Sequence, residues 1–197
     1  MSGGANTTTR IDMLIRKFLA GAALAVAFLG AAQATTVNLP TNGTWAEFDV
    51  DHVEFGTPNW IDIADGSDLS FAFTVPVGLI GALTVVDAGF AGDRFEVFAN
   101  AASLGFTSAA INSYPTSIGL DFDAALADSN YSRTVFTLAA GDYLITGRLS
   151  LSALDDLDAP IDASVGGLNV MLVPEPATYL MLLAGLGLLT IRRRRGT

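Results

Sequence analysis

Cysteine is absent from this chain of 197 residues, so a folded domain here can have neither disulfides nor thiolate metal ligands. Histidine occurs once, as His52, and a catalytic serine site or a metal site would have to be built around that one imidazole. Neither the Gly-x-Ser-x-Gly nor the His-Glu-x-x-His pattern is present. We therefore expect a packed apolar core to stabilise the fold, and His52 to be a solvated residue on an acidic strand.

Basic residues are also scarce in the middle of the chain. The whole sequence has ten basic and 20 acidic residues, a formal charge of -10. Between positions 35 and 173 the basic residues are Arg94, Arg133 and Arg148 against 18 acidic ones, a net charge of -15. A hydrophobic content of 51% is too high for a disordered acidic tail, and this charge repels phosphate. The middle segment is predicted to be a folded acidic domain that binds no nucleic acid.

The N-terminal segment has the order of a secretory signal. Arg16-Lys17 precedes the apolar run Phe18 to Gly30, and Ala32-Gln33-Ala34 supplies the small-x-small pattern of a cleavage site. We predict a signal peptide over 1–34, with Met13 as an alternative start, that uses the Sec machinery and is cut by signal peptidase. The alternative is a retained anchor, although the apolar run is short for a span of about 20 residues.

A second apolar segment lies near the C-terminus. The uncharged run Ala177 to Ile191 follows Pro174-Glu175-Pro176 and precedes four consecutive arginines. As a helix it would cover roughly 22 Å, short for a hydrocarbon core of about 30 Å. We expect a brief transmembrane anchor whose arginines stay cytoplasmic and whose acidic domain lies outside the inner membrane. A plain tail anchor, with prolines that merely begin the helix, is the alternative.

This order of motif, apolar helix and basic tail resembles the PEP-CTERM sorting signal of Gram-negative bacteria, over about residues 173–195. The resemblance implies that an exosortase recognises the tripeptide and removes the helix, so that the membrane holds the protein transiently before it reaches the cell surface or the extracellular space. It further implies bacteria that make exopolysaccharide, with biofilm or floc matrix as the usual destination. The residues assigned to sorting in this way are Pro174, Glu175 and Pro176, with Arg192, Arg193, Arg194 and Arg195 as the topological stop.

Residues 35–172 have the pattern of a β-rich domain, with short strands separated by Gly, Pro, Asn and Asp. One short helix is expected, over Asp121–Ser129. The predicted fold is all-β, an antiparallel sandwich or jelly roll flanked by an N-terminal signal helix and a C-terminal transmembrane helix. The expected strands are 45–50, 60–63, 69–75, 82–86, 94–99, 134–138, 143–151 and 168–173.

Acidic loops make calcium the one cofactor for which the sequence offers candidate ligands, because hard cations take carboxylate and carbonyl oxygens. No loop has the EF-hand spacing. The alternative is a solvated acidic surface that keeps the domain soluble. The candidate ligands are Asp62, Asp65 and Asp68; Asp121 and Asp123; and Asp155, Asp156, Asp158 and Asp162.

Residues 83–98 resemble a recurring block of secreted sandwich domains that precede this sorting signal. Within the block, Asp93 is expected to pair with Arg94 or to cap the Gly-containing connection 87–93. The resemblance names no ligand for these domains.

The sequence thus favours an exported, non-enzymatic surface or matrix protein. One alternative is a carbohydrate-binding module, which needs exposed aromatic rings. At most two of its aromatic candidates should be exposed, since large rings in small sandwiches usually lie in the core. The other alternative is a glycoside hydrolase that uses two carboxylates. The aromatic candidates are Trp45, Trp60, Tyr114, Tyr131 and Tyr143.

Overall fold

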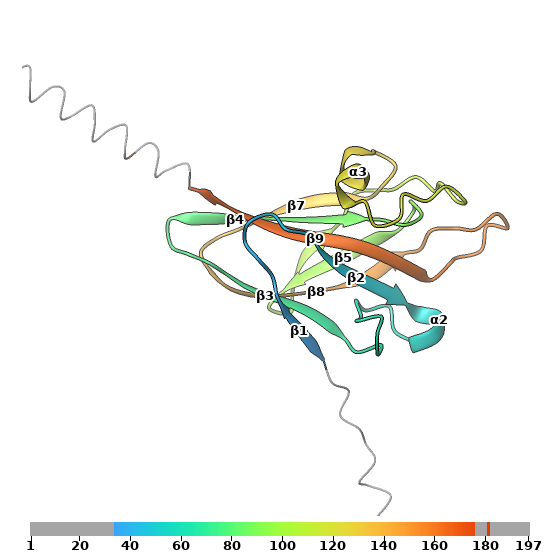
Figure 1. Cartoon of the computed structure of the whole chain (residues 1–197), viewed down its shortest axis with the longest axis horizontal. Coiled ribbons are helices and arrows are strands. Elements are labelled where there is room, and N and C mark those ends of the chain that lie inside the picture. Colours follow the sequence, from blue (N-terminus) through green and yellow to red (C-terminus); the bar gives the residue numbers. More distant parts are fainter. Residues whose placement is uncertain (1–33, 176–180, 182–197) are drawn as a thin grey trace, which may run out of the picture. The chain divides into compact units, whose positions relative to one another are not determined.

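The computed structural model describes residues 34–175 and Met181 (Figure 1). It contains a five-stranded sheet of order β1-β3-β8-β5-β6, called sheet A here, and a four-stranded sheet of order β2-β9-β4-β7, called sheet B. The expected signal segment with Ala32, and most of the C-terminal segment with Arg192 to Arg195, lie outside the described residues. The elements are β1 Thr35–Asn38, β2 Ala46–Asp51, α2 His52–Phe55, β3 Leu69–Val75, β4 Leu79–Asp87, β5 Arg94–Ala99, β6 Ala102–Phe106, α3 Phe122–Ala127, β7 Arg133–Leu138, β8 Gly141–Leu151 and β9 Ala163–Pro174.

The all-β prediction is confirmed, and the strand order is that of a jelly roll. From β2 onward the chain crosses between the sheets after nearly every strand, so that the orders are 2-9-4-7 and 3-8-5-6. Only β5 and β6 are consecutive neighbours within one sheet. One detail departs from the expected antiparallel arrangement: β1 pairs with β3 in parallel, with Thr35 opposite Leu69.

Alternating apolar residues place the core between the sheets. On β3, Phe71, Phe73 and Val75 are buried while Thr74 is exposed, as expected for a strand with one face in the core. The Trp60 ring stacks on Phe48 at 3.9 Å between centroids, and Phe95 meets Phe48 edge-on at 5.0 Å. Aromatic packing thus occupies the centre of a core that has no disulfide.

Two strand glycines make room for these rings. A Cβ on Gly147 of β8 would lie 2.2 Å from the Trp60 ring, and one on Gly166 of β9 would lie 2.3 Å from Phe48. Both contacts are too close for any side chain. Glycine therefore occurs inside these strands because the rings pack directly on the strand backbone, rather than to form a turn.

Most strand predictions are confirmed, with β3 and β5 matching at both ends. The expected strand 60–63 is wrong, since Ile61 forms only isolated bridges, to Asp49 and Asp68. Strands β1 and β6 were not expected. The helix expected over 121–129 is α3, with Asp121 as its N-cap.

The connections gather at two opposite ends of the sandwich. Leu79 pairs with Pro174, Gly81 with Leu138 and Gly141 with Val75, which brings the turns 76–78 and 139–140 to one end. Asn100 joins them, because its backbone N–H donates to Leu144 O. We call this the motif end: residues 76–78, 100–101, 139–142 and 174–175. The opposite end, with α2 and α3 (right in Figure 1), comprises residues 49–68, 87–93, 107–132 and 152–165 and is called the acidic end.

Candidate functional site

The expected sorting motif begins inside the folded domain. Pro174 is the last residue of β9 and lies opposite Leu79 of β4. The Glu175 N–H donates to the Gly78 carbonyl at 3.2 Å, which holds Glu175 against the β3–β4 turn. Pro176 lies outside the described residues. The ladder therefore ends at the motif itself, with no spacer between them.

The other predicted boundary is the cleavage site after Ala34. Ala34 is exposed and directly precedes β1, whose Thr35 donates its backbone N–H to Asp68 O at 2.8 Å. The start of β1 lies at the acidic end, opposite the sorting motif. Cleavage at this position stays a prediction.

Acidic residues are distributed very unevenly along the sandwich. Between positions 35 and 173, every acidic residue except Glu47, Glu96 and Asp142 lies at the acidic end. The motif end has Asp142 and, in the motif, Glu175. The acidic residues at the acidic end are Asp49, Asp51, Glu54, Asp62, Asp65, Asp68, Asp87, Asp93, Asp121, Asp123, Asp128, Asp155, Asp156, Asp158 and Asp162.

The calcium candidates in the loop 62–68 bond their own surroundings. Asp62 accepts from the Ala64 N–H at 2.9 Å, and Asp65 from the Ser67 N–H at 3.0 Å. The Ser67 bonds lower the pKa of Asp65. Asp68 accepts from Asn59 Nδ2 at 3.2 Å. Asp62 and Asp65 therefore stabilise turns of the loop, and Asp68 links its end to Asn59.

The remaining calcium candidates lie at the start of α3 and in the loop between β8 and β9. Asp155 accepts from the Leu157 and Ala159 N–H groups at 2.8 and 2.9 Å. Asp121 caps α3 through the Ala124 N–H, and Asp123 accepts from Trp45 Nε1 at 2.9 Å. Asp156 and Asp158 are exposed, and Asp162 is half-buried. Within residues 34–175, no three acidic or histidine side chains are placed to hold one metal ion. Calcium binding stays a prediction.

Two carboxyl groups are buried at the acidic end. Asp87 is fully buried, and its Oδ2 accepts from the Gly92 and Asp93 N–H groups at 3.3 Å each, so Asp87 closes the connection from β4 to β5. Its Oδ1 has no partner among the described residues. Burial, with the nearby Asp93 charge, raises the pKa of Asp87 above neutral. A protonated Asp87 avoids the large cost of a buried charge.

Asp93 ties this connection to two distant segments. Its Oδ1 accepts from the Ala153 N–H and its Oδ2 from Ser164 Oγ, both at 2.7 Å. Burial raises the pKa of Asp93 as well. Both expected roles of Asp93 are wrong. The Arg94 guanidinium donates instead to Thr107 O at 3.0 Å and lies over the Phe106 ring, and the carboxylate that caps the connection 87–93 is that of Asp87.

A cavity of about 230 Å³ opens at the acidic end beside Asp93. Asp49, Asp51, Phe90 and Ser164 line it with Asp93. Burial, together with the charges of Glu47 and Asp62, raises the pKa of Asp49 to about 6. Two carboxyl groups with raised pKa values therefore share one cavity, a combination that is frequent at functional sites.

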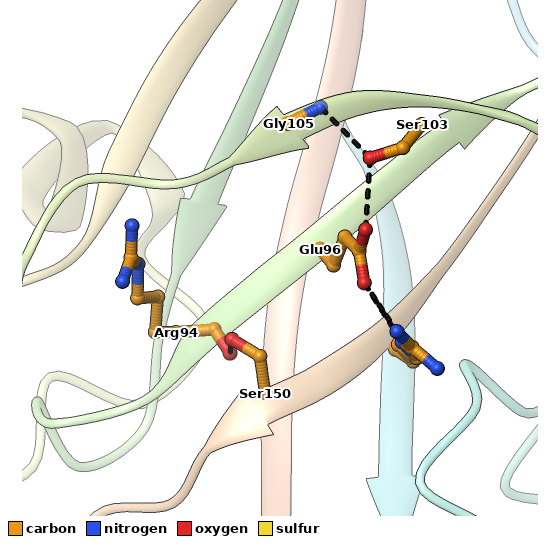
Figure 2. A network of polar contacts seen from close by, with 6 residues as sticks. Arg94, Glu96, Ser103, Gly105 and Ser150 are labelled. Atoms are coloured by element: carbon orange, nitrogen blue, oxygen red, sulfur yellow. Dashed lines mark hydrogen bonds and ion pairs between the residues drawn. The ribbon is translucent and has the colours of Figure 1, made fainter.

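The outer face of sheet A carries a polar network (Figure 2). Arg148 of β8 donates through Nε to Glu96 of β5 at 2.9 Å, and Ser103 of β6 donates to the other carboxylate oxygen at 2.8 Å. The Arg148 guanidinium also lies 5.5 Å from the Phe98 ring centre. These contacts join three neighbouring strands and lower the pKa of Glu96.

A second cavity, of about 260 Å³, adjoins this network. Its walls include Asn59, Asp68, Phe98 and Arg148, with Trp60 at its inner side. Amide, carboxylate and guanidinium groups are thus placed beside an aromatic ring. The sequence offered Asp68 and Trp60 as candidates for other roles but did not predict this site, since its residues come from the connection before β3 and from strands β3, β5 and β8 and carry no shared motif.

The single histidine and the aromatic candidates follow expectation in part. His52 is exposed, as expected, but it lies on the one-turn helix α2 rather than on a strand. Tyr114, at 36% relative exposure, is the exposed ring among the five candidates, while Trp60 and Tyr131 are buried. Trp45 and Tyr143 are half-buried.

Within residues 34–175 and at Met181, no helix has the length and apolarity that crossing a membrane requires.

Comparisons with known proteins identify a motif in the C-terminal segment. Residues 172–195 match the family model of the PEP-CTERM protein-sorting motif. Curated proteins give no match. Among solved structures, the chain is similar to the pre-peptidase C-terminal domain of a Bacillus anthracis collagenase, with 10% identity, 71% of this chain and 96% of that chain covered, and a TM-score of 0.37. It is also similar to PliG, a periplasmic inhibitor of g-type lysozyme from Aeromonas hydrophila, with 13% identity, coverage of 73% and 100%, and a TM-score of 0.37.

The protein is therefore an all-β domain joined directly to a sorting segment. It is a PEP-CTERM motif-containing protein, and the motif supports export and sorting by an exosortase, with a membrane-anchored precursor.

Proposed function

We propose that the protein is a non-enzymatic cell-surface or extracellular-matrix protein of a Gram-negative bacterium, with a structural or adhesive role in an exopolysaccharide biofilm or floc. The observation that carries this proposal is the direct junction of β9 with Pro174 and Glu175. Such a junction delivers the whole folded domain, rather than a peptide on a linker, to the processing enzyme. Removal of the apolar segment would then release that domain intact.

Glu175→Ala tests the sorting step. In the native host, immunoblots of membrane and medium fractions should show a full-length membrane form that accumulates, because the motif residue between the two prolines is lost. Asp142→Ala, which removes an exposed acidic residue at the same end of the domain, serves as the matched control and should leave processing unchanged. An unchanged processed fraction in Glu175→Ala would show that the tripeptide is not the processing determinant.

A carbohydrate-binding role is supported by the cavity on sheet A. Asn59, Asp68 and Arg148 offer hydrogen-bonding groups beside the half-exposed Phe98 ring, a mixture that suits the polar and apolar edges of a sugar. A glycan array with and without calcium tests binding. Phe98→Ala should abolish it, whereas Phe106→Ala, which removes another ring on sheet A, should not. Trp60 is unsuitable as a probe because it is buried.

A glycoside hydrolase is the third candidate, supported by the carboxyl groups of Asp49 and Asp93 in one cavity. If the protein hydrolyses polysaccharide, turnover should disappear in Asp49→Asn. Asp51→Asn is the matched control from the same wall of the cavity. Release of reducing sugar from exopolysaccharide is the measurement, and no turnover by the unaltered protein would reject this candidate.

A further inference from the structure

We propose that the motif end is a lipid-contacting surface: in the anchored precursor, the turn Pro76-Val77-Gly78 rests on the bilayer and the acidic end points away from it. This inference rests on the proposed membrane-anchored precursor and adds to it an orientation and a contact surface. The partner is the lipid surface itself.

The first support is the length of the connection. Pro174 is still held in the ladder, and the uncharged apolar run begins at Ala177. Three Cα steps separate them, which span at most roughly 11 Å when fully extended. The β3–β4 turn is bonded to Glu175 within this stretch. A bilayer that takes up the apolar run therefore cannot be far from this turn.

The second support is the composition of the motif end. Its turns contain proline, valine, glycine, alanine and asparagine, with Asp142 and the motif residue Glu175 as its two acidic residues. The Asp142 carboxylate already accepts from Thr74 Oγ1 at 2.6 Å. Val77 is 95% exposed. One exposed valine on a protein surface is ordinary, but here it lies in the turn that is bonded to the start of the tether.

The third support is charge. Strand β9 has 12 residues, so it separates the two ends by roughly 37 Å. This distance is several times the Debye length of about 8 Å at physiological ionic strength. Repulsion between anionic lipids and the acidic end is therefore screened when the motif end faces the bilayer. The inverted orientation would bring the acidic carboxylates to the lipid surface. The connection from Pro174 to Ala177 is too short for this, because it spans roughly 11 Å and the two ends are roughly 37 Å apart.

Two matched single-cysteine variants test the orientation, because the chain has no cysteine of its own. Val77→Cys lies at the motif end and Leu157→Cys at the acidic end, in exposed loop positions of 95% and 82% relative exposure. The full-length protein, produced without exosortase, is labelled with a polarity-sensitive fluorophore. It is then reconstituted into vesicles of phosphatidylcholine and phosphatidylglycerol. Iodide reports contact with water, and nitroxide-labelled lipid reports contact with the bilayer.

The label at position 77 should be quenched by nitroxide lipid and be about threefold less sensitive to iodide than the label at position 157, as expected for a group in the lipid interface. Equal iodide quenching at the two positions in vesicle-bound protein would overturn the inference. Flotation separates this failure from failure of anchoring: protein that does not float with the vesicles contradicts the anchored precursor itself. Because these vesicles hold only lipid, protection cannot come from exosortase.

Discussion

The two ends of the sandwich differ in almost every property. The motif end is made of short turns with Asp142 and Glu175 as its acidic residues, while the acidic end has long connections, both described helices and the buried Asp87 and Asp93. Long loops on a rigid scaffold are where binding sites usually form. The C-terminal segment leaves the described fold at the motif end. In the proposed orientation, the end with the greater chemical variety faces outward.

The sharpest test of this difference compares one glycine from each end. Gly92 has φ of +140°, and a Cβ there would lie 2.8 Å from Ala153 Cβ. Gly78 has φ of +85°, and a Cβ there would meet nothing within 4 Å. Gly92→Ala should cost about 3 kcal/mol in the free energy of unfolding, from overpacking and backbone strain. Gly78→Ala should cost only the strain, about 1 kcal/mol. Equal losses in urea denaturation would show that the two ends are equally packed.

The buried carboxyl groups predict a pH dependence that belongs to the acidic end. Because the pKa values of Asp87, Asp93 and Asp49 are raised in the folded state, that state keeps protons that the unfolded chain releases. Stability should therefore fall as pH rises above about 4, by up to about 1.4 kcal/mol per pH unit for each proton held by Asp87 or Asp93. The half-exposed Asp49 should contribute less, because solvent screens its charge. Above neutral pH, Asp87 should account for most of the further decrease in the free energy of unfolding, because its pKa is the highest of the three.

Asp87→Asn should flatten this fall, which urea midpoints at pH 5, 7 and 8 would measure. Asp142→Asn at the motif end is the control and should keep the slope of the unaltered protein. An unchanged slope in Asp87→Asn would mean that Asp87 is ionised in the folded domain at neutral pH.

The network on sheet A lies between the two ends and should have an intermediate effect. Glu96→Gln removes the ion pair with Arg148, whose side chain is 52% exposed against 11% for Glu96. Solvent screening limits the loss to about 1 kcal/mol. Glu47→Gln, an exposed acidic residue of sheet B, should change the urea midpoint far less. Equal effects would show that the network is not stabilising.

The smallest effect is expected at the exposed tips of both ends. Val77→Ser and Leu157→Ser should each change stability by less than about 0.5 kcal/mol, since neither side chain is buried. The two variants should differ only when lipid is present, with Val77→Ser binding vesicles more weakly. Thermal melts of both variants, recorded with and without vesicles, measure whether the two differ in stability only when lipid is present.

Local sequence patterns predicted the regular strands well, and failed where a strand depends on distant packing. Phe71 and Phe73 alternate with small or polar residues, so β3 was readable from its own sequence. The first half of β9 was missed because Gly166-Gly167 looks like a turn, whereas Phe48 and Phe122 occupy the space that side chains would need. Strand β6 was missed for a different reason: it begins with Ala102-Ser103 and shows no apolar alternation.

The candidate sites divide in the same way. The sorting motif was predictable because its residues are contiguous. The partners of Asp93 were not, since Ala153 and Ser164 lie 60 and 71 positions away in the sequence. The cavity beside Phe98 likewise combines residues from four separate stretches of the chain.

By itself, the sequence determined the β-rich class, the acidic middle segment and the sorting motif, because periodicity, charge and contiguous motifs are local properties. Only the tertiary structure decided that nearly all acidic residues gather at one end, that Asp87 and Asp93 are buried there, and that the sorting motif leaves from the other. The physical reason is the jelly-roll path, which crosses between sheets at almost every connection. Residues far apart in the chain thus become neighbours, and alternate connections fall at opposite ends.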